Sequence, residues 1–195
     1  MQDDPKLLAA LRDRSPEAFQ ELFDLYSDKM YRLAVSIVGD ENDAEDVVQE
    51  AFIKFFEKIE TFEGRSTIGT WLYQVTHNAS IDRVRRKKSG TLLESDLPEA
   101  EDGLPMPERI ASWDASVTEL YDQQELLELL DAAMQSLPEK LRGAFFLRDI
   151  EEMSTEETAE ILGISPGAVK VRLHRARLLM REQLTAVLGN AVQRN

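Results

Sequence analysis

The chain has 195 residues, 43% of them hydrophobic, and a formal net charge of −14 at pH 7. This length allows one or two small domains, each with its own core. The absence of cysteine excludes disulfides and thiolate metal sites, and two isolated histidines are too few for a metal centre. No apolar run reaches membrane-spanning length and the N-terminus is no signal peptide. We therefore expect a cytoplasmic protein without membrane insertion, metal or cofactor.

Helical periodicity describes the first part of the chain. A short helix from Asp3 to Arg12 should break before Ser15 and Pro16, which are suited to cap and start a second helix. Gly39 should end that helix. Its apolar residues recur at helical spacing, and we interpret the aromatic ones as core residues: Phe19, Leu22, Phe23, Tyr26, Met30, Leu33, Ala34 and Ile37.

A third helix is predicted from the cap pair Asn42 and Glu45 to about Ile59. Acids near its N-terminus are favoured by the helix dipole, which is reason enough for their presence. Yet Asp46, Gln49 and Glu50 share one side of this helix. That side presents acids to any partner that docks there.

A fourth helix is predicted from about Thr67 to Lys88, with Ile68, Leu72, Val75 and Ala79 as its buried stripe. Trp71 borders this stripe, so we expect it in the core. Five of the six residues from Arg83 to Lys88 are basic, which exceeds what capping of a helix C-terminus requires.

The stretch from Ser89 to Leu120 is rich in glycine, proline and acids, and is typical of a flexible, self-repelling linker. Trp113 within it is equally well explained as a local anchor or as a chance exposed aromatic. Helical patterns resume at about Thr118, break at Leu137 and Pro138, and continue from Glu139 to Ile150. We predict an all-α fold with domains at 1–88 and 119–195, joined by a linker at 89–118.

The strongest local signal lies between Ser154 and Arg181. Ser154 and Glu157 form a capping box, Gly163 ends the first helix, and Ser165 with Pro166 starts a second one. Two helices joined by a short turn that contains glycine make a helix-turn-helix.

A helical wheel divides the second helix of this motif into two faces. One is an apolar stripe of Val169, Leu173, Ala176, Met180 and Leu184. The other carries small residues and long donors, namely Gly167, Ala168, Lys170, Val171, His174 and Arg175, with Arg172 and Arg177 at its flanks. This split favours a DNA recognition helix over a basic solvated helix. The remaining acidic surface should be repelled by bulk DNA and drawn to a basic protein.

Two blocks of sequence resemble a known family. LYSDKMYRLAVSIVGDENDAEDVVQEAFIKFFEKIETFEG with TWLYQVTHNASIDRVRRKK resembles region 2 of the extracytoplasmic-function sigma factors of the sigma-70 family. LPEKLRGAFFLRDIEEMSTEETAEILGISPGAVKVRLHRAR resembles their region 4. The blocks follow the family's order and cover about Phe19 to Lys88 and Tyr121 to Leu184.

The resemblance implies a bacterial, non-enzymatic factor that carries core RNA polymerase to promoters, with stress-response genes as the expected targets and an anti-sigma factor as an expected partner. The clamp of the polymerase's largest subunit would contact Asp43, Glu45, Asp46, Gln49 and Glu50. The upstream-ten promoter element, including a flipped base, would meet Phe62, Arg65, Ser66, Thr67, Asn78, Arg83, Arg85 and Arg86. The upstream-thirty-five element would meet Gly167, Lys170, Val171, Arg172, His174, Arg175 and Arg177.

Two positions depart from the family pattern. His77 stands where relatives commonly carry arginine, and we expect a surface histidine without a role. Val171 replaces a frequent serine, which suggests contact with a thymine methyl group. The alternative function is a stand-alone helix-turn-helix regulator whose N-terminal bundle senses a ligand or dimerises. An enzyme is a distant third, because no catalytic constellation converges.

Overall fold

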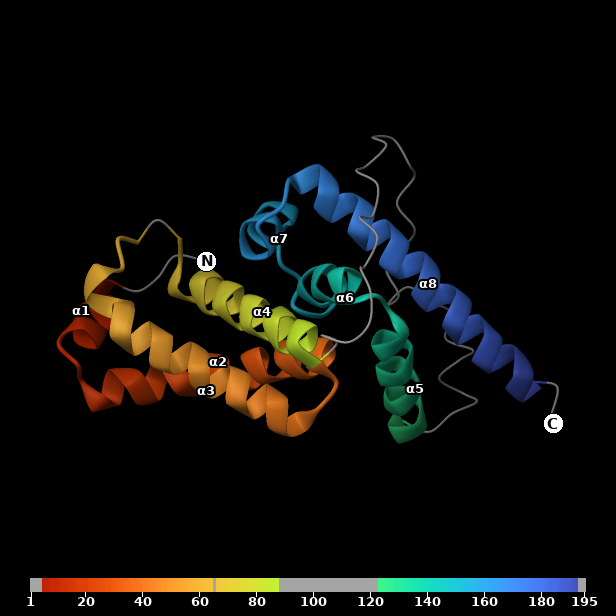
Figure 1. Cartoon of the computed structure of the whole chain (residues 1–195), viewed down its shortest axis with the longest axis horizontal. Helices are drawn as coiled ribbons and strands as arrows, with labels where there is room; N and C mark the ends of the chain where they lie inside the picture. Colours follow the sequence, from red (N-terminus) through yellow and green to blue (C-terminus); the bar gives the residue numbers. More distant parts are fainter. Residues whose placement is uncertain (1–4, 65, 88–122, 193–195) are drawn as a thin grey trace. The chain divides into compact units, whose positions relative to one another are not determined.

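The computed structural model describes residues 5–64, 66–87 and 123–192, and every secondary-structure element within these ranges is a helix. The chain divides into two compact units, the first built from α1 to α4 and the second from α5, α6, α8 and most of α7 (Figure 1). The predicted all-α fold is confirmed. The predicted linker, its boundaries and Trp113 lie outside the described residues.

The first unit is a bundle of three long helices preceded by a short one. Its elements are α1 (Pro5–Arg12), α2 (Pro16–Val38), α3 (Glu41–Lys58), the 3₁₀ turn η1 (Ile59–Thr61) and α4 (Ile68–Lys87). The long helices α2, α3 and α4 pack against one another pairwise, and α1 contacts α2 and η1. The core is largely aliphatic, with Leu22, Met30, Leu33, Ile37, Phe55, Ile59, Ile68 and Leu72 among its most deeply buried side chains.

Local capping explains where these helices begin and end. The Ser15 hydroxyl accepts a hydrogen bond from the Ala18 amide, as predicted, and Gly39 ends α2 in the left-handed conformation with φ 69°. The cap of α3 was wrongly predicted. Asp40, not Asn42, accepts a bond of 2.9 Å from the Asp43 amide, so α3 begins two residues earlier than the sequence pattern suggested.

Close packing between α2 and α4 requires Gly69. A Cβ atom at this position would lie 2.8 Å from the Tyr26 ring and hydroxyl. The buried face of α4 is also more polar than predicted, since Thr76, His77 and Ser80 are buried while Val75 and Ala79 are only half-buried. On α2, Phe23 was expected in the core but is 49% exposed, and its ring lies 5.1 Å from that of Phe52.

The second unit contains α5 (Gln123–Ser136), α6 (Glu139–Phe145), the π-helical turn η3 (Phe146–Ile150), α7 (Thr155–Leu162) and α8 (Pro166–Val192). Its core joins α5, α6 and α8 through Ala133, Leu137, Leu141, Phe145, Leu173, Ala176, Met180 and Leu184. All five residues of the predicted stripe on α8 are buried. This stripe therefore faces the core, and the opposite side of α8 is turned away from it.

Candidate nucleic-acid and polymerase interfaces

The helix-turn-helix is fixed by two caps. In the capping box, Glu157 Oε2 accepts from the Ser154 amide at 2.9 Å, and Ser154 Oγ accepts from the Glu157 amide at 3.1 Å. The Ser154 amide and the Ser154 hydroxyl, which both donate to the Glu157 carboxylate, hold the pKa of Glu157 below its usual range. Gly163 turns the chain with φ 64°, and Ser165 Oγ accepts from the Ala168 amide at 3.1 Å at the start of α8. The predicted helix-turn-helix is confirmed, because Ser154, Glu157 and Ser165 make the capping hydrogen bonds that the sequence predicted.

The face of α8 opposite the core carries most of the residues predicted to meet the upstream-thirty-five element. Lys170 is exposed, and half-buried positions are occupied by Gly167, Val171, Arg172, His174 and Arg175. His174 Nδ1 is buried and makes no hydrogen bond in the described part of the chain. This face offers cationic side chains, an imidazole and an apolar side chain together. Such a combination suits contact with a base edge and its neighbouring phosphates.

Arg177 does not belong to this face, and its predicted position at the edge of the exposed surface is wrong. Its side chain is only 7% exposed, and that of Asp149 is 6% exposed. Arg177 Nε and Nη2 donate to the two carboxylate oxygens of Asp149 at 2.8 and 2.6 Å. This bidentate pair ties α8 to η3, so Arg177 supports the fold instead of facing DNA.

A second correction concerns the basic end of α4. Arg83 was predicted to meet DNA and Asp43 to meet polymerase, yet Arg83 Nε donates to Asp43 Oδ1 at 2.8 Å. Arg83 Nη2 donates to Asp46 Oδ2 at 2.6 Å, and Lys87 pairs with Asp43 Oδ2. Asp43 is buried, so it is not positioned to contact a partner protein directly. The predicted acidic and basic sites therefore adjoin each other across α3 and α4.

The ion pairs shift the protonation equilibria of their members. Hydrogen bonds from Lys87 and Arg83 hold the pKa of Asp43 below its usual range. The Asp43 carboxylate raises the pKa of Lys87 in turn, and Asp46 followed by Asp43 raises the pKa of Arg83. Each of these three shifts favours the charged form of its group.

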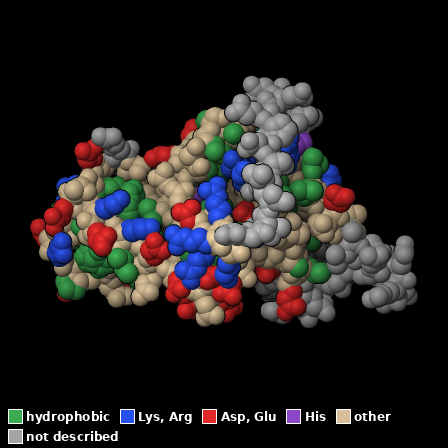
Figure 2. Space-filling model, viewed as in Figure 1, with side chains coloured by type: hydrophobic (Ala, Val, Ile, Leu, Met, Phe, Trp, Pro, Cys, Tyr) green, Lys and Arg blue, Asp and Glu red, His purple; other side chains and the backbone are tan. Residues whose placement is uncertain are grey.

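The other residues predicted to contact polymerase, and the other arginines at the end of α4, lie on the surface of the first unit. On α3 the exposed residues are Glu45, Asp46, Gln49 and Glu50, and Glu50 also pairs with Lys54 one turn later at 2.6 Å. Arg85 and Arg86 are exposed near the end of α4. Figure 2 shows Lys and Arg side chains gathered at this end of α4 next to a group of Asp and Glu side chains. The first unit thus presents opposite charges side by side.

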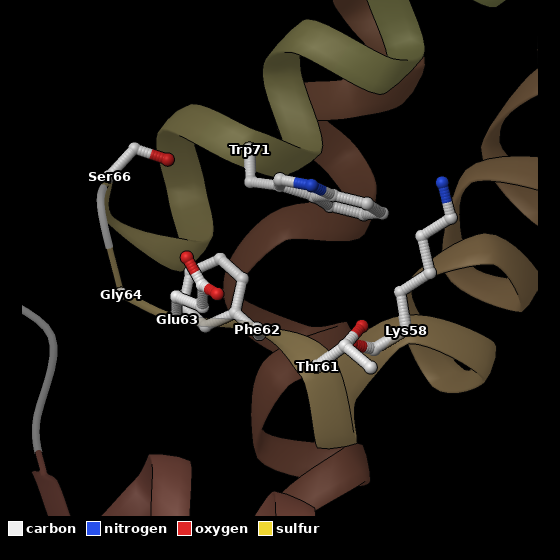
Figure 3. A pocket seen from close by; sticks show the side chains of 7 residues that line it. All are labelled: Lys58, Thr61, Phe62, Glu63, Gly64, Ser66 and Trp71. Carbon is white, nitrogen blue, oxygen red and sulfur yellow. The ribbon is translucent and has the colours of Figure 1, made fainter.

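A pocket of about 340 Å³ opens beside the segment that joins η1 to α4. It is lined by Lys58, Thr61, Phe62, Glu63, Gly64, Ser66 and Trp71 (Figure 3). The indole of Trp71 extends from α4 over this segment, and Lys58 rises on the other side from the end of α3 (Figure 3). The volume is within the range of small-ligand sites, and the walls offer a stacking surface together with polar groups.

The structure places some predicted upstream-ten residues at this pocket and others elsewhere. Phe62 and Ser66 line it, and Thr67 caps α4 by accepting from the Thr70 amide at 3.1 Å. Arg65 lies outside the described residues. Asn78 is exposed on α4 and is not among the lining residues. His77 is buried, contrary to the expected surface position, with Nδ1 3.4 Å from Asn78 Oδ1.

Sequence reasoning missed Lys58 and assigned Trp71 to the core. Trp71 is in fact half-buried: its ring centre is 5.5 Å from that of Phe55, and it also lines the pocket. One signal could have revealed this. An aromatic residue at the edge of an apolar stripe, four positions after a predicted loop, is placed to serve both the core and that loop.

Taken together, the helical bundle with its pocket and the capped helix-turn-helix define a two-part, all-helical DNA-binding protein. Residues 22–90 match the family model for sigma-70 region 2, and residues 127–180 match that for sigma-70 region 4. The chain belongs to the extracytoplasmic-function RNA polymerase sigma factors of the sigma-70 family. This decides between the two functions weighed from the sequence, and it confirms that the chain is not an enzyme.

Several relatives are similar over nearly their whole length. The chain is 35% identical to the sigma factor SigW of Bacillus subtilis (strain 168), over 92% of this chain and 95% of the relative. It is 30% identical to the sigma-E factor of Haemophilus influenzae, over 95% of this chain and 97% of that protein.

Two solved structures share the fold. CnrH in complex with the cytosolic domain of CnrY has a TM-score of 0.66 and 22% identity, covering 92% of this chain and 96% of that one. The sigma factor RpoE of Bartonella quintana, solved with the anti-sigma factor NepR, has a TM-score of 0.62 and 25% identity, covering 86% and 96%. Among the described helices, none is both long and apolar enough to cross a membrane.

Proposed function

We propose that the two units divide the work of promoter recognition. The exposed side of α3, made of Glu45, Asp46, Gln49 and Glu50, binds a basic surface on the clamp of core RNA polymerase. The pocket beside Phe62 holds a flipped base of the upstream-ten element. The outward face of α8 reads the upstream-thirty-five element.

The observation that carries this proposal is the charge division within the first unit. Acids are exposed along the front of α3, while Arg85 and Arg86 are exposed at the end of α4. One surface suits a basic protein and the other suits phosphates, so a single small bundle can hold polymerase and DNA at once. A regulator that acts without polymerase has no need of the acidic surface.

The pocket supports the role in promoter opening. Extruding a base costs a few kcal/mol, which stacking and hydrogen bonding in the pocket must return. Trp71 and Phe62 provide aromatic surfaces, and Lys58, Glu63 and Ser66 provide polar groups (Figure 3). Base–aromatic stacking contributes about 1–3 kcal/mol per base, enough to offset the larger part of that cost.

The partners and setting follow from the same reading. We propose that the protein acts in the cytoplasm, where core polymerase and promoters are found, on promoters of stress-response genes. An anti-sigma factor is a further proposed partner, because the similar sigma factor RpoE of Bartonella quintana was solved in complex with the anti-sigma factor NepR.

Co-elution with purified core polymerase tests the acidic surface. The double variant Glu45→Lys/Glu50→Lys should lose binding to core, because two repulsive contacts replace two attractive ones. The matched control is Glu21→Lys/Asp28→Lys, which makes the same charge change at exposed positions of α2. Equal loss in both variants, or in neither, would contradict the proposed contact surface.

Fluorescence anisotropy tests the promoter-reading role. Free protein should bind promoter duplex only in the non-specific range, about 10⁻⁴–10⁻⁶ M, because its net charge of −14 opposes DNA. Addition of core should produce tight, sequence-specific binding. Tight specific binding by the protein alone would instead show that polymerase is not needed to assemble the DNA-binding surface.

A further inference from the structure

The ion pairs between α3 and α4 join two surfaces that the proposed function assigns to different partners. Arg83 lies on α4 just before Arg85 and Arg86, the basic residues proposed for DNA, and Asp46 is among the acids proposed for polymerase. They are 37 residues apart in sequence but 2.6 Å apart in the structure. Neither side chain can meet its own partner fully while it holds the other.

The cluster has a fixed part and an exchangeable part. Asp43 has an 11% exposed side chain and is held by both Arg83 and Lys87. Asp46 has a 60% exposed side chain and contacts only Nη2 of the Arg83 guanidinium, an atom that also lies 2.8 Å from Asp43 Oδ1. Buried pairs are hard to break, whereas exposed pairs are weak and screened by salt. A partner can therefore displace the Asp46 bond and leave the Asp43 anchor in place.

The charges within the cluster cancel. Arg83 and Lys87 supply two positive charges, and Asp43 and Asp46 supply two negative ones. In this arrangement Arg83 and Lys87 together produce little net electrostatic attraction for phosphates. Removing Asp46 from the cluster would leave it with one net positive charge, while Arg83 Nη2 would keep its contact of 2.8 Å with Asp43 Oδ1.

We propose that the Asp46–Arg83 pair couples polymerase binding to DNA binding. This inference rests on the proposed function. When a basic polymerase surface binds Asp46, the Nη2 N–H of Arg83 that met Asp46 becomes available to a DNA phosphate, while Asp43 keeps the arginine in position. Because binding free energies are reciprocal, an occupied Arg83 also makes Asp46 more available to polymerase. Asp43 is thus a positioning residue and not a polymerase contact.

The first experiment measures DNA binding by the full-length free protein. The probe is a short fluorescein-labelled duplex of mixed sequence, titrated over a series of salt concentrations. Asp46→Asn should raise affinity by about two- to fivefold, the range that an exposed ion pair allows. The slope of log K against log salt should steepen by about 0.9, which corresponds to one added phosphate contact.

Two variants separate the pair from a general change in charge. Glu41→Gln removes the same charge from an exposed position in the first turn of α3 and should change affinity and slope less. Asp46→Asn/Arg83→Gln should return affinity to the wild-type level, because the released donor is gone. Equal effects of Asp46→Asn and Glu41→Gln, or a double variant that keeps the gain, would overturn the inference.

The second experiment measures affinity for core polymerase without DNA. Arg83→Gln removes the competitor for Asp46, so binding to core should tighten by about two- to fivefold. Lys29→Gln, the same charge change on α2, should not tighten it. A gain in DNA affinity without this gain in core affinity would overturn the coupling. The proposed polymerase surface would survive that result if Glu45→Lys/Glu50→Lys still abolished co-elution.

Discussion

Arg12 Nη2 donates a hydrogen bond of 2.6 Å to the main-chain carbonyl oxygen of Phe62, fifty residues further along the chain. Two residues on, Arg14 Nη2 donates to Glu60 Oε1 at 3.0 Å. The C-terminal end of α1 is therefore fastened to the segment that forms one wall of the pocket. The position of Phe62 depends on a helix that itself does not line the pocket.

Arg12→Ala should impair promoter opening more than it impairs binding to core polymerase. The lost bond contributes about 0.5–1.5 kcal/mol to holding the Phe62 carbonyl, and the aromatic wall becomes looser without it. Permanganate reactivity of the upstream-ten thymines in the complex with core reports opening directly. Arg14→Ala, which removes only an exposed ion pair, is the control and should have a smaller effect. If both variants open promoters normally, α1 does not position the pocket.

Trp71→Leu should reduce promoter opening more than Asn78→Ala does. Leucine keeps an apolar side chain against Phe55 but removes the indole surface over the pocket, at a cost of about 1–3 kcal/mol of stacking. Asn78 is exposed and outside the lining of the pocket, so its loss should matter less. Opening rates with 2-aminopurine placed in the upstream-ten element would measure both. A larger defect in Asn78→Ala would return the base contact to Asn78.

Arg177→Ala should destabilise the second unit by about 3–5 kcal/mol, because it leaves the buried Asp149 carboxylate without its bidentate partner. Arg175→Ala should leave stability unchanged and lower promoter affinity by about 1–3 kcal/mol if it reads a base. Urea unfolding followed by circular dichroism separates these effects. The double variant Arg177→Met/Asp149→Leu should recover most of the stability, and no recovery would contradict the structural role of the pair.

Asp43→Asn should flatten the dependence of stability on pH below about pH 4. The pKa of Asp43 is lowered by Lys87 and Arg83, so its contribution is fully present above the unfolded value of about 3.9. That contribution is lost as the pH falls through the lower folded pKa. Lys87 has a raised pKa, so its contribution to stability is fully present below its unfolded-state pKa of about 10.4. That contribution is lost as the pH rises through the pKa of Lys87 in the folded state. Urea midpoints across acidic pH test this, with Asp28→Asn as control. An unchanged slope in Asp43→Asn would contradict the prediction.

The sequence by itself determined those features that depend on neighbours a few residues away. The bonds of Ser15, Ser154, Glu157 and Ser165 formed as predicted, because a capping side chain reaches only the amides of its own helix turn. The apolar stripe of α8 was equally predictable, since helical spacing alone decides which residues share a face. The N-cap of α3 was predicted at Asn42, only two residues from the observed cap, Asp40.

Only the tertiary structure decided the pairings between distant residues. Arg83 and Arg177 have the same local pattern as Arg85 and Arg175: each is a basic residue on a helix. What separates them is an acid brought close by packing, Asp46 in one unit and Asp149 in the other, at sequence separations of 37 and 28 residues. Trp71 likewise became a pocket wall because α3 and η1 bring Lys58 and Phe62 opposite it. A wheel shows which way a side chain points, but the partner that meets it there is supplied by the packing of other helices.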